Sequence, residues 1–571
     1  MPCRRPSLVL LLAVALGVLA GCGQSRPTAR LAEGGLDPPE VPREFRAAWI
    51  ATVANIDWPS EPGLPVPAQK RELGRMLDEA AALNLNAVIF QVRPHADALY
   101  DSPHEPWSFY LTGAQGRAPE PAYDPLAFAV REAHERGLAL HAWFNPYRAG
   151  HPADTSALAP THVANRHPSW VREYGDYLWL DPGLPAVRNH THRVIMDVVR
   201  RYDVDGVHFD DYFYPYPAYA DGAPFPDSAS WARARERGWT GSRADWRRHN
   251  VNRLVERLYR SIKEEKPHVQ FGISPFGIWR PDHPPGTRGF DAYAELYADA
   301  RTWLQNGWVD YMTPQLYYRL DQFGYSYPEM LRWWIEQNEQ DRHLWPGLYT
   351  SRVGMTGERH WSHRQILGQI HTARSHPGAT GQVHFSMAAL MPLPDSVRDE
   401  DTTALTPVLD TLTADSVLVG GRATDSVAAG TTAADSVSVV RTSAPPRSVQ
   451  STRRLRTRLR TESYGRPALV PPSPWLGDDA PAAPRVTVRR PEIPPTLVLT
   501  PADEPPRWWL VRWRDGDAWR MDLIPGTRDT YTVPPPEGQF SLETVHVSGV
   551  GRFGHVGPPA PARLHSPARP R

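Results

Sequence analysis

The amino-acid sequence predicts an α/β fold, a (β/α)₈ TIM barrel, followed by a small all-β domain. Eight short apolar segments alternate with amphipathic helical segments between about residues 46 and 390, which is typical of a parallel α/β fold. The count of eight favours a closed barrel over a doubly wound sheet. No GxGxxG motif follows the first apolar segment, which argues against a dinucleotide-binding fold.

Each predicted strand is a short apolar run, and the helical segments between the strands carry apolar residues on one face. The predicted strands are Arg46–Thr52, Ala87–Arg93, Leu138–Asn145, Gly206–Phe213, Gln270–Phe276, Val309–Tyr317, His343–Thr350 and Gln382–Met387. The helical segments include Gln69–Leu83, Pro125–Arg136, Pro185–Arg201, Asp245–Glu265 and His363–Ser375.

The composition excludes several classes of protein. The chain has 571 residues, with 63 Lys and Arg against 63 Asp and Glu, so its net charge is zero and a nucleic-acid partner is not expected. Hydrophobic residues make up 41% of the chain, which is enough for a folded core. Its 2 cysteines, Cys3 and Cys22, both precede the predicted fold, so we expect no disulfide or thiol nucleophile there.

The N-terminus resembles a bacterial lipoprotein signal. Two arginines precede an apolar run, Leu8–Ala20, which is too short to span a bilayer, and the run ends in Leu-Ala-Gly-Cys. We expect residues 1–21 to be a signal peptide, Cys22 to carry lipid and residues 22–44 to be a tether. Because an Asp after the lipidated cysteine would favour the inner membrane, Gly23 favours the outer membrane. The predicted location is therefore the cell envelope, lipid-anchored, facing the periplasm.

The composition changes abruptly after the eighth predicted strand. The triplet Asp-Ser-Val recurs at Asp415, Asp425 and Asp435, among Ser, Thr, Ala and Gly, which predicts a disordered low-complexity insertion. The predicted organisation is a barrel at 45–397, the insertion at 398–462, the end of the barrel and a linker at 463–485, a β domain at 486–562 and a tail at 563–571.

The β domain is predicted from short alternating segments separated by Gly, Pro and Asp turns. These segments are Trp508–Arg514, Trp519–Ile524, Asp529–Val533 and Phe540–Val547, and their pattern resembles a fibronectin type III sandwich. The domain could be a spacer or a docking module.

The fourth predicted strand carries the most informative polar residues. Side chains alternate along a strand, so Val207 and Phe209 should face the helices while His208 and Asp210 face the barrel interior. Catalytic groups of TIM barrels lie at the C-terminal ends of the strands. The alternative is that Asp210 only forms an ion pair with Arg93. The other inward polar pairs are Gln91 and Arg93, His141 and Asn145, Gln315 and Tyr317, and His384 and Ser386.

The remaining motifs narrow the chemistry. The sequence has no HxH or HExxH metal motif, no GxSxG and no P-loop, so no metal and no cofactor are predicted. A carboxylate surrounded by aromatic residues suits carbohydrate chemistry, because sugar rings stack on aromatic faces and glycoside cleavage needs two carboxyl groups. The residues therefore favour a carboxylate-based glycoside hydrolase.

Seven segments resemble the glycosyl hydrolase-like family ten. They are Glu44–Pro59, Val88–Pro94, Ala142–Arg148, Trp179–Gly183, Asp205–Pro215, Gly272–Arg280 and Asp310–Tyr318. The best-described member of that family is a divisome-localised lipoprotein that cuts peptidoglycan strands. The resemblance implies a TIM-barrel glycosidase of the envelope that acts on glycan strands rich in N-acetylated sugars.

The resemblance places the family's fourth-strand acid at Asp210 or Asp211, and we take Asp210 as the primary catalytic carboxylate and Asp211 as its partner. The second acid stays open between Asp211, Asp97 and Asp57. Catalysis assisted by the substrate's N-acetyl group is a further alternative. The predicted substrate-binding residues are Arg93, His95, Asp97, Trp143, Asn145, His208, Tyr212, Trp279, Gln315 and Tyr317.

Two functions compete. The first is hydrolysis of glycan strands, with peptidoglycan as the expected substrate and a secreted exopolysaccharide as the alternative. The second is a non-catalytic barrel that binds polysaccharide and tethers the envelope to the cell wall. If none of the other candidate acids faces Asp210, the binding function gains support.

Overall fold

The computed structural model describes residues 38–355, 360–392, 449–478, 480–489, 494–515, 518–534 and 544–564. The helices and strands reported below belong to one compact unit, Val41–Arg571. The predicted signal peptide, Cys22 and most of the tether and of the low-complexity insertion lie outside the described residues. None of the described helices is both long and apolar enough to cross a membrane.

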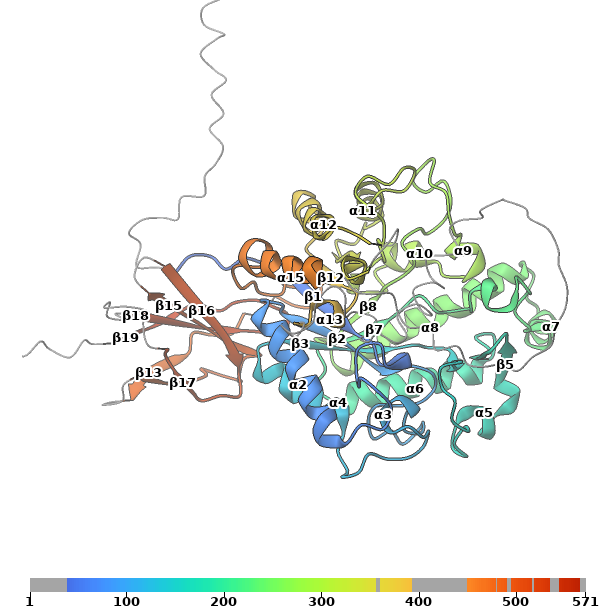
Figure 1. Ribbon diagram of the computed structural model, residues 1–571, viewed down its shortest axis with the longest axis horizontal. Coiled ribbons are helices and arrows are strands. Elements are labelled where there is room, and N and C mark those ends of the chain that lie inside the picture. Colours follow the sequence, from blue (N-terminus) through green and yellow to red (C-terminus); the bar gives the residue numbers. More distant parts are fainter. Residues whose placement is uncertain are drawn as a thin grey trace, which may run out of the picture. The chain divides into compact units, whose positions relative to one another are not determined.

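A sheet of nine parallel strands forms the centre of the first domain (Figure 1). The strands are β1 (Phe45–Ile50), β2 (Ala87–Arg93), β3 (Ala139–Phe144), β7 (Gly206–Phe209), β8 (Gln270–Ile273), β9 (Tyr311–Met312), β10 (His343–Leu344), β11 (Gly347–Leu348) and β12 (Gly381–His384). Their order is β10-β9-β8-β7-β3-β2-β1-β12-β11. The prediction of a parallel, TIM-barrel-like α/β domain is therefore confirmed.

The seventh predicted strand, His343–Thr350, forms two short strands in the structure. Pro346 has no N–H group to donate to a neighbouring strand, and it separates β10 from β11. Since β10 pairs with β9 and β11 pairs with β12, this one segment joins the two ends of the strand order. The sheet curls round on itself for that reason.

Helices lie outside the curled sheet, and proline or a capping side chain starts most of them. Asp124, Ser242 and Ser362 each accept a hydrogen bond from a backbone N–H of the first turn, and Ser326 forms a capping box with Glu329. The longer helices are α2 (Val66–Ala82), α4 (Pro125–Glu135), α6 (Pro185–Arg201), α7 (Ser228–Glu236), α8 (Arg243–Glu265), α11 (Tyr327–Glu336) and α12 (His363–Ser375).

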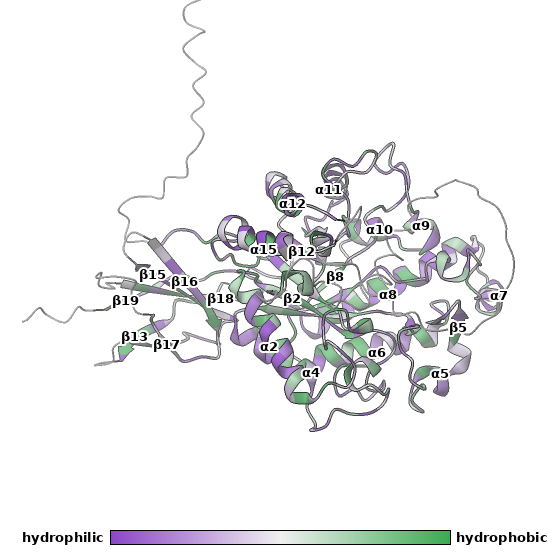
Figure 2. Ribbon diagram, viewed as in Figure 1, coloured by the Kyte–Doolittle hydropathy of each residue, from purple (hydrophilic) through white to green (hydrophobic). Residues whose placement is uncertain are grey.

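Shorter elements connect these helices and strands. They are α3 (Phe109–Thr112), α5 (Val163–Arg166), α9 (Ala292–Glu295), α10 (Ala300–Gln305) and α13 (Met387–Leu390), with a small antiparallel sheet of β4 (Arg148–Gly150), β6 (Tyr177–Leu180) and β5 (Val171–Tyr174). Figure 2 shows hydrophobic residues along the central strands and both kinds of residue on the helices, as expected for helices that cover a core on one face.

The two faces of the strands carry different cores. Val207 and Phe209 pack in the cluster shared with the helices, as predicted. Val383 of β12 packs in the separate interior cluster with Phe45 and Trp49. The prediction that His384 faces inward is therefore wrong. Val383 pairs with Ala47 of β1, and both side chains belong to the interior cluster, so His384 points to the opposite face, where its ring lies 2.7 Å from the hydroxyl of Tyr464.

The C-terminal part of the predicted insertion is folded. Residues Val449–Arg458 form helix α15, and a π-helical turn, Leu459–Ser463, follows it. Leu455, Leu459 and Tyr464 are fully buried, and Arg456 forms an ion pair with Glu79 of α2. The predicted boundary at 462 is therefore wrong, because two leucines four residues apart form an apolar stripe within an arginine-rich segment.

We expect Leu455→Ala to lower the free energy of unfolding by about 3 kcal/mol, since it removes a fully buried side chain. The control is Arg454→Ala, an exposed position one residue away, which should change the stability by less than about 0.5 kcal/mol. Chemical denaturation of both variants measures the difference. Equal stability of both variants would contradict the packing of α15 on the barrel.

Two antiparallel sheets form the C-terminal β region, as predicted. One contains β13 (Arg485–Arg489), β14 (Thr496–Thr500) and β17 (Thr530–Thr532), and the other contains β16 (Ala518–Pro525), β15 (Trp508–Asp515), β18 (Thr544–Val550) and β19 (Ala560–Arg563). Leu497 and Leu499 share a core with Trp509 and Val511 of the other sheet. The likeness to fibronectin type III stays a prediction.

Candidate active site

A small cavity of about 50 Å³ lies at the C-terminal ends of several barrel strands. The side chains around it come from the ends of β1, β2, β3 and β7, from the start of β4, and from the segments that follow β1, β8, β9 and β12. Its lining residues are Trp49, Ala51, Val53, Ile56, Gln91, Trp143, Arg148, Asp210, Asp211, Tyr212, Ser274, Gln315, Tyr317 and Phe385. The cavity combines two acids, one arginine and several aromatic rings.

Asp210 follows β7 directly and is held by two side chains from the neighbouring strand end. Trp143 donates a hydrogen bond from Nε1 to Asp210 Oδ2 at 3.0 Å, and Asn145 donates from Nδ2 to both carboxylate oxygens at 3.2 Å. The backbone N–H of Arg148 in turn donates to Asn145 Oδ1 at 2.8 Å, which fixes the amide orientation. Asp210 is 3% exposed, so the carboxyl group is fixed and nearly dry.

Burial raises the pKa of Asp210 to about 7, because the charged form loses its hydration. The negative charge of Asp211 raises this pKa further, whereas Arg148 and the hydrogen bonds from Trp143 and Asn145 lower it. A carboxyl group with a pKa near neutrality can donate a proton at physiological pH.

Asp211 lines the same cavity although strand alternation predicts the opposite direction. The strand β7 ends at Phe209, so the chain has already turned when it reaches Asp211. Gln315 donates a hydrogen bond from Nε2 to Asp211 Oδ1 at 3.0 Å, and the hydroxyl of Tyr216 donates to Oδ2. Burial raises the pKa of Asp211, and the hydrogen bonds from Tyr216 and Gln315 lower it.

Beneath the cavity lies His208, which was predicted to bind substrate. Its Nε2 accepts a hydrogen bond from Trp49 Nε1 at 3.1 Å, and its Nδ1 lies 3.0 Å from the hydroxyl of Tyr311. Burial lowers the pKa of His208 well below its usual value, so the ring is neutral. His208 is not among the residues that line the cavity; it supports Trp49 and Ser274, which are.

Arg148 lines the cavity, although it was not among the predicted site residues. It is 1% exposed, its Nε donates to the carbonyl of Pro94 at 3.1 Å, and its guanidinium lies 5.0 Å from the ring centre of Tyr212. Within the described part of the chain, Nη1 has no hydrogen-bond partner. Its charge lowers the pKa of both Asp210 and Asp211. The only signal was its place in the Asn-Pro-Tyr-Arg segment after the third strand.

Four predicted substrate-binding residues line the cavity and a fifth, Asn145, lies behind Asp210; the four are Trp143, Tyr212, Gln315 and Tyr317. Gln91, Ser274 and Phe385 also line it but were not predicted as binding residues.

Four other predicted binding residues lie elsewhere. Arg93 donates from Nε to Glu105 at 2.7 Å, so the alternative of an Arg93–Asp210 ion pair is wrong. Trp279 stacks on Trp333, with ring centres 5.9 Å apart, and therefore belongs to the packing of a later loop. His95 and Asp97 meet Asp154 in a separate buried cluster. Strand position alone did not reveal these partners, because they come from helix α11 and from loops outside the strands.

The three candidates for the second acid differ in the contacts that their carboxylates make. Asp57 accepts hydrogen bonds from the backbone N–H of Ala51 at 2.7 Å, from Ser386 Oγ at 2.6 Å and from the backbone N–H of Ala388 at 2.8 Å, so it joins two loops. Asp57 and Asp97 are absent from the lining of the cavity, whereas Asp211 is present. Of the three candidates, only Asp211 therefore shares the cavity with Asp210.

One family model and two glycosyl hydrolases match the sequence of this chain. A family model described as glycosyl hydrolase-like 10 matches residues 44–363. Glycosyl hydrolase YngK of Bacillus subtilis is 38% identical over 453 residues, which cover 78% of this chain and 76% of YngK. Glycosyl hydrolase DigH of Escherichia coli K12 is 37% identical over 377 residues, covering 62% of this chain and 84% of DigH.

Among solved structures, the PgaB (BpsB) glycoside hydrolase domain from Bordetella bronchiseptica is similar with a TM-score of 0.39 and 16% identity. That match covers 62% of this chain and 96% of the other.

Proposed function

Since this chain belongs to the glycosyl hydrolase-like 10 family, we propose that it hydrolyses glycosidic bonds in amino-sugar glycan strands, with peptidoglycan as the substrate. The observation that carries the proposal is the pair of buried acids, Asp210 and Asp211, which line one cavity beside aromatic rings. Buried acids with raised pKa values at the C-terminal ends of barrel strands are typical of catalytic groups.

In this proposal Asp210 is the general acid. Its protonated carboxyl donates a proton to the glycosidic oxygen as the bond from that oxygen to C1 breaks. The N-acetyl oxygen of the same sugar bonds to C1, and the Asp211 carboxylate accepts a hydrogen bond from the N-acetyl N–H. The bond between the N-acetyl oxygen and C1 closes a five-membered ring on the sugar. Water then attacks C1, the ionised Asp210 takes a proton from that water, and the bond from C1 to the N-acetyl oxygen breaks, which opens the ring again. The net reaction adds water across one glycosidic bond.

The choice of substrate-assisted catalysis follows from the acids around the cavity. Asp210 and Asp211 are adjacent in the chain, and no other Asp or Glu of the described residues lines the cavity. The hydrogen bonds from Tyr216 and Gln315 orient the Asp211 carboxylate. A substrate that supplies its own nucleophile needs only an acid and a group that orients the acetamide, and the pair can fill both roles.

The proposal is tested by incubating the purified protein with peptidoglycan glycan strands that have been stripped of peptides. We expect new reducing ends to appear with time. A parallel reaction with a poly-N-acetylglucosamine exopolysaccharide tests the alternative substrate. Strands that bind without producing reducing ends would support the non-catalytic barrel and contradict the proposed hydrolase.

We expect kcat/KM to fall above about pH 7. Burial raises the pKa of Asp210 to about 7, so the proton-donating form predominates below that pH and is lost above it. Above the pKa of an essential acid, its protonated fraction, and with it the rate, falls roughly tenfold per pH unit. Initial rates between about pH 5 and pH 9 measure the effect, with thermal unfolding at each pH as the control. A flat profile up to pH 9 would exclude Asp210 as the proton donor.

We also propose that lipid on Cys22 holds the protein at the outer membrane, facing the periplasm. The support is the signal-like N-terminus, which ends in Leu-Ala-Gly-Cys. Cys22→Ser should move the protein from the membrane fraction to the soluble periplasmic fraction without changing its hydrolytic rate, because Cys22 precedes the barrel. Retention of the variant in washed membranes would show that another segment is the anchor.

A further inference from the structure

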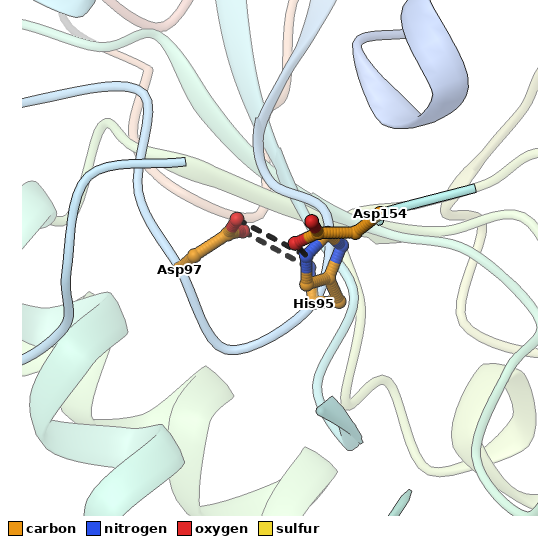
Figure 3. A group of neighbouring side chains, drawn as sticks. All are labelled: His95, Asp97 and Asp154. Carbon is orange, nitrogen blue, oxygen red and sulfur yellow. Dashed lines mark hydrogen bonds and ion pairs between the residues drawn. The ribbon is translucent and has the colours of Figure 1, made fainter. Parts of the chain in front are cut away.

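Three side chains from two loops meet in a buried cluster, shown in Figure 3. His95 and Asp97 belong to the loop that follows β2, and Asp154 belongs to the loop that follows β4. Nε2 of His95 lies 3.2 Å from Oδ2 of Asp97 and 3.1 Å from Oδ2 of Asp154. The three potential ligand atoms all lie within 4.8 Å of one another.

The charges of this cluster do not balance. His95 and Asp97 have no exposed side-chain surface, and Asp154 is 5% exposed. Two ionised carboxylates carry more negative charge than one histidine can neutralise, and the single Nε2 of His95 lies within 3.2 Å of both of them. Burial of such a charge is costly unless a further cation is present.

One oxygen of the cluster also has no hydrogen-bond donor. Oδ1 of Asp97 accepts a hydrogen bond from the backbone N–H of His95 at 3.3 Å, but Oδ2, on the side of the cluster, accepts none from the described residues. Oδ2 of Asp97 is buried and lies 3.2 Å from His95 Nε2 without a hydrogen bond from the described residues, and such a setting suits a bound cation.

We propose that His95, Asp97 and Asp154 bind one divalent transition-metal ion, Zn²⁺ or Mn²⁺. Ligands bound at roughly 2.0–2.2 Å around such an ion lie about 3.0–3.4 Å apart, which agrees with both distances from His95. A neutral histidine and two carboxylates bring the charge of the site to zero. Imidazole nitrogen in the set favours a transition metal over Mg²⁺ or Ca²⁺, which prefer oxygen ligands.

The ion would join two loops next to the cavity. Pro94, the neighbour of His95, accepts the hydrogen bond from Nε of Arg148. Ser156 donates from its backbone N–H and from Oγ to Asp154 Oδ1, at 2.9 and 2.7 Å, and leaves Oδ2 directed at His95. The site therefore has a structural role beside the Arg148 side of the cavity. The sequence did not predict this metal site, because no short motif links Asp154 to His95 and Asp97.

The test uses the purified full chain after treatment with a chelator. Titration with ZnCl₂ or MnCl₂ alone, followed by calorimetry and elemental analysis, should give one bound ion per chain. The melting temperature should rise by about 5 °C at roughly 100 times Kd, whereas MgCl₂ should have no effect. Failure of both Zn²⁺ and Mn²⁺ to bind saturably would overturn the proposal, whatever the hydrolytic activity.

Two variants locate the ion. Asp154→Asn and His95→Gln should each weaken binding by more than about 100-fold, which exceeds the cost of removing a group that only orients a ligand. The matched control is Asp203→Asn, which removes a carboxylate 3.9 Å from Nδ1 of His134, outside the cluster. That variant should bind the ion as the unmodified chain does. Unchanged affinity in Asp154→Asn, or equal loss in Asp203→Asn, would overturn the assignment.

Discussion

Asp210→Asn should lower kcat on glycan strands by at least about 100-fold, the low end for loss of a general acid. Asparagine keeps the shape of the side chain and can still pair with Trp143 and Asn145, but it cannot donate the proton. Binding of the strands should persist, because stacking on aromatic rings does not require the carboxyl group. Reducing-end assays measure kcat, and a strand pull-down measures binding.

The control for Asp210→Asn is Asp181→Asn. Asp181 is also fully buried with a raised pKa, but it bonds Ser230 and Arg172 outside the cavity. The Asp181→Asn variant should lose stability but keep kcat within about threefold of the unmodified protein, because Asp181 does not line the cavity. If Asp210→Asn retains more than about a tenth of kcat with unchanged KM, the proposed mechanism is wrong.

Asp210→Asn should be more stable than the unmodified protein although it is less active. The pKa of Asp210 is raised to about 7 in the folded protein, so its protonated form is favoured by folding. The stabilisation that comes from the protonated form of Asp210 is fully present below the pKa that Asp210 has in the unfolded chain. It is lost as the pH rises through 7, and it amounts to a few kcal/mol, at about 1.4 kcal/mol per pKa unit. At pH 8, Asp210→Asn should therefore melt at a higher temperature than the unmodified protein, and the difference should shrink towards pH 4.

Asp211→Asn should lower kcat by about 100-fold as well. The variant loses the carboxylate that accepts the hydrogen bond from the substrate's N-acetyl N–H in the proposed mechanism. It also weakens the hydrogen bonds from Tyr216 and Gln315. It also removes a negative charge that raises the pKa of Asp210, so the fall in rate with pH should begin at a lower pH. Rates measured across pH distinguish this shift from a general loss of folding.

A double variant decides whether the two acids act as one unit. If they do, Asp210→Asn combined with Asp211→Asn should be little slower than either single variant, because groups that act together are strongly non-additive. Multiplied losses would instead indicate two independent contributions. A near-normal rate for Asp211→Asn alone would exclude it as the second catalytic acid.

Much of the fold could be predicted from local pattern. Alternating apolar strands and amphipathic helices predicted the parallel, TIM-barrel-like domain, and short alternating segments predicted the C-terminal β sheets. Period-two alternation also placed Val207 and Phe209 outside and His208 inside. These properties depend on the spacing of apolar residues, which neighbouring residues in the chain determine.

Local sequence pattern was enough to predict which strand end carries the acids, whereas the packing of distant segments brings together the groups that meet there. The sequence favoured Asp211 as the partner of Asp210 but left Asp57 and Asp97 open, and packing placed Asp211, of these three, in the cavity with Asp210. The physical reason is that side-chain direction follows strand period only while the strand lasts. Beyond the last strand residue, loops from distant segments set the contacts.

The same reason accounts for what local pattern missed. The buried Arg148, the helix α15 and the cluster of His95, Asp97 and Asp154 all depend on contacts between residues far apart in the chain. The pKa of Asp210 near 7 likewise depends on burial and on the charges around it, which exist only after the chain has folded.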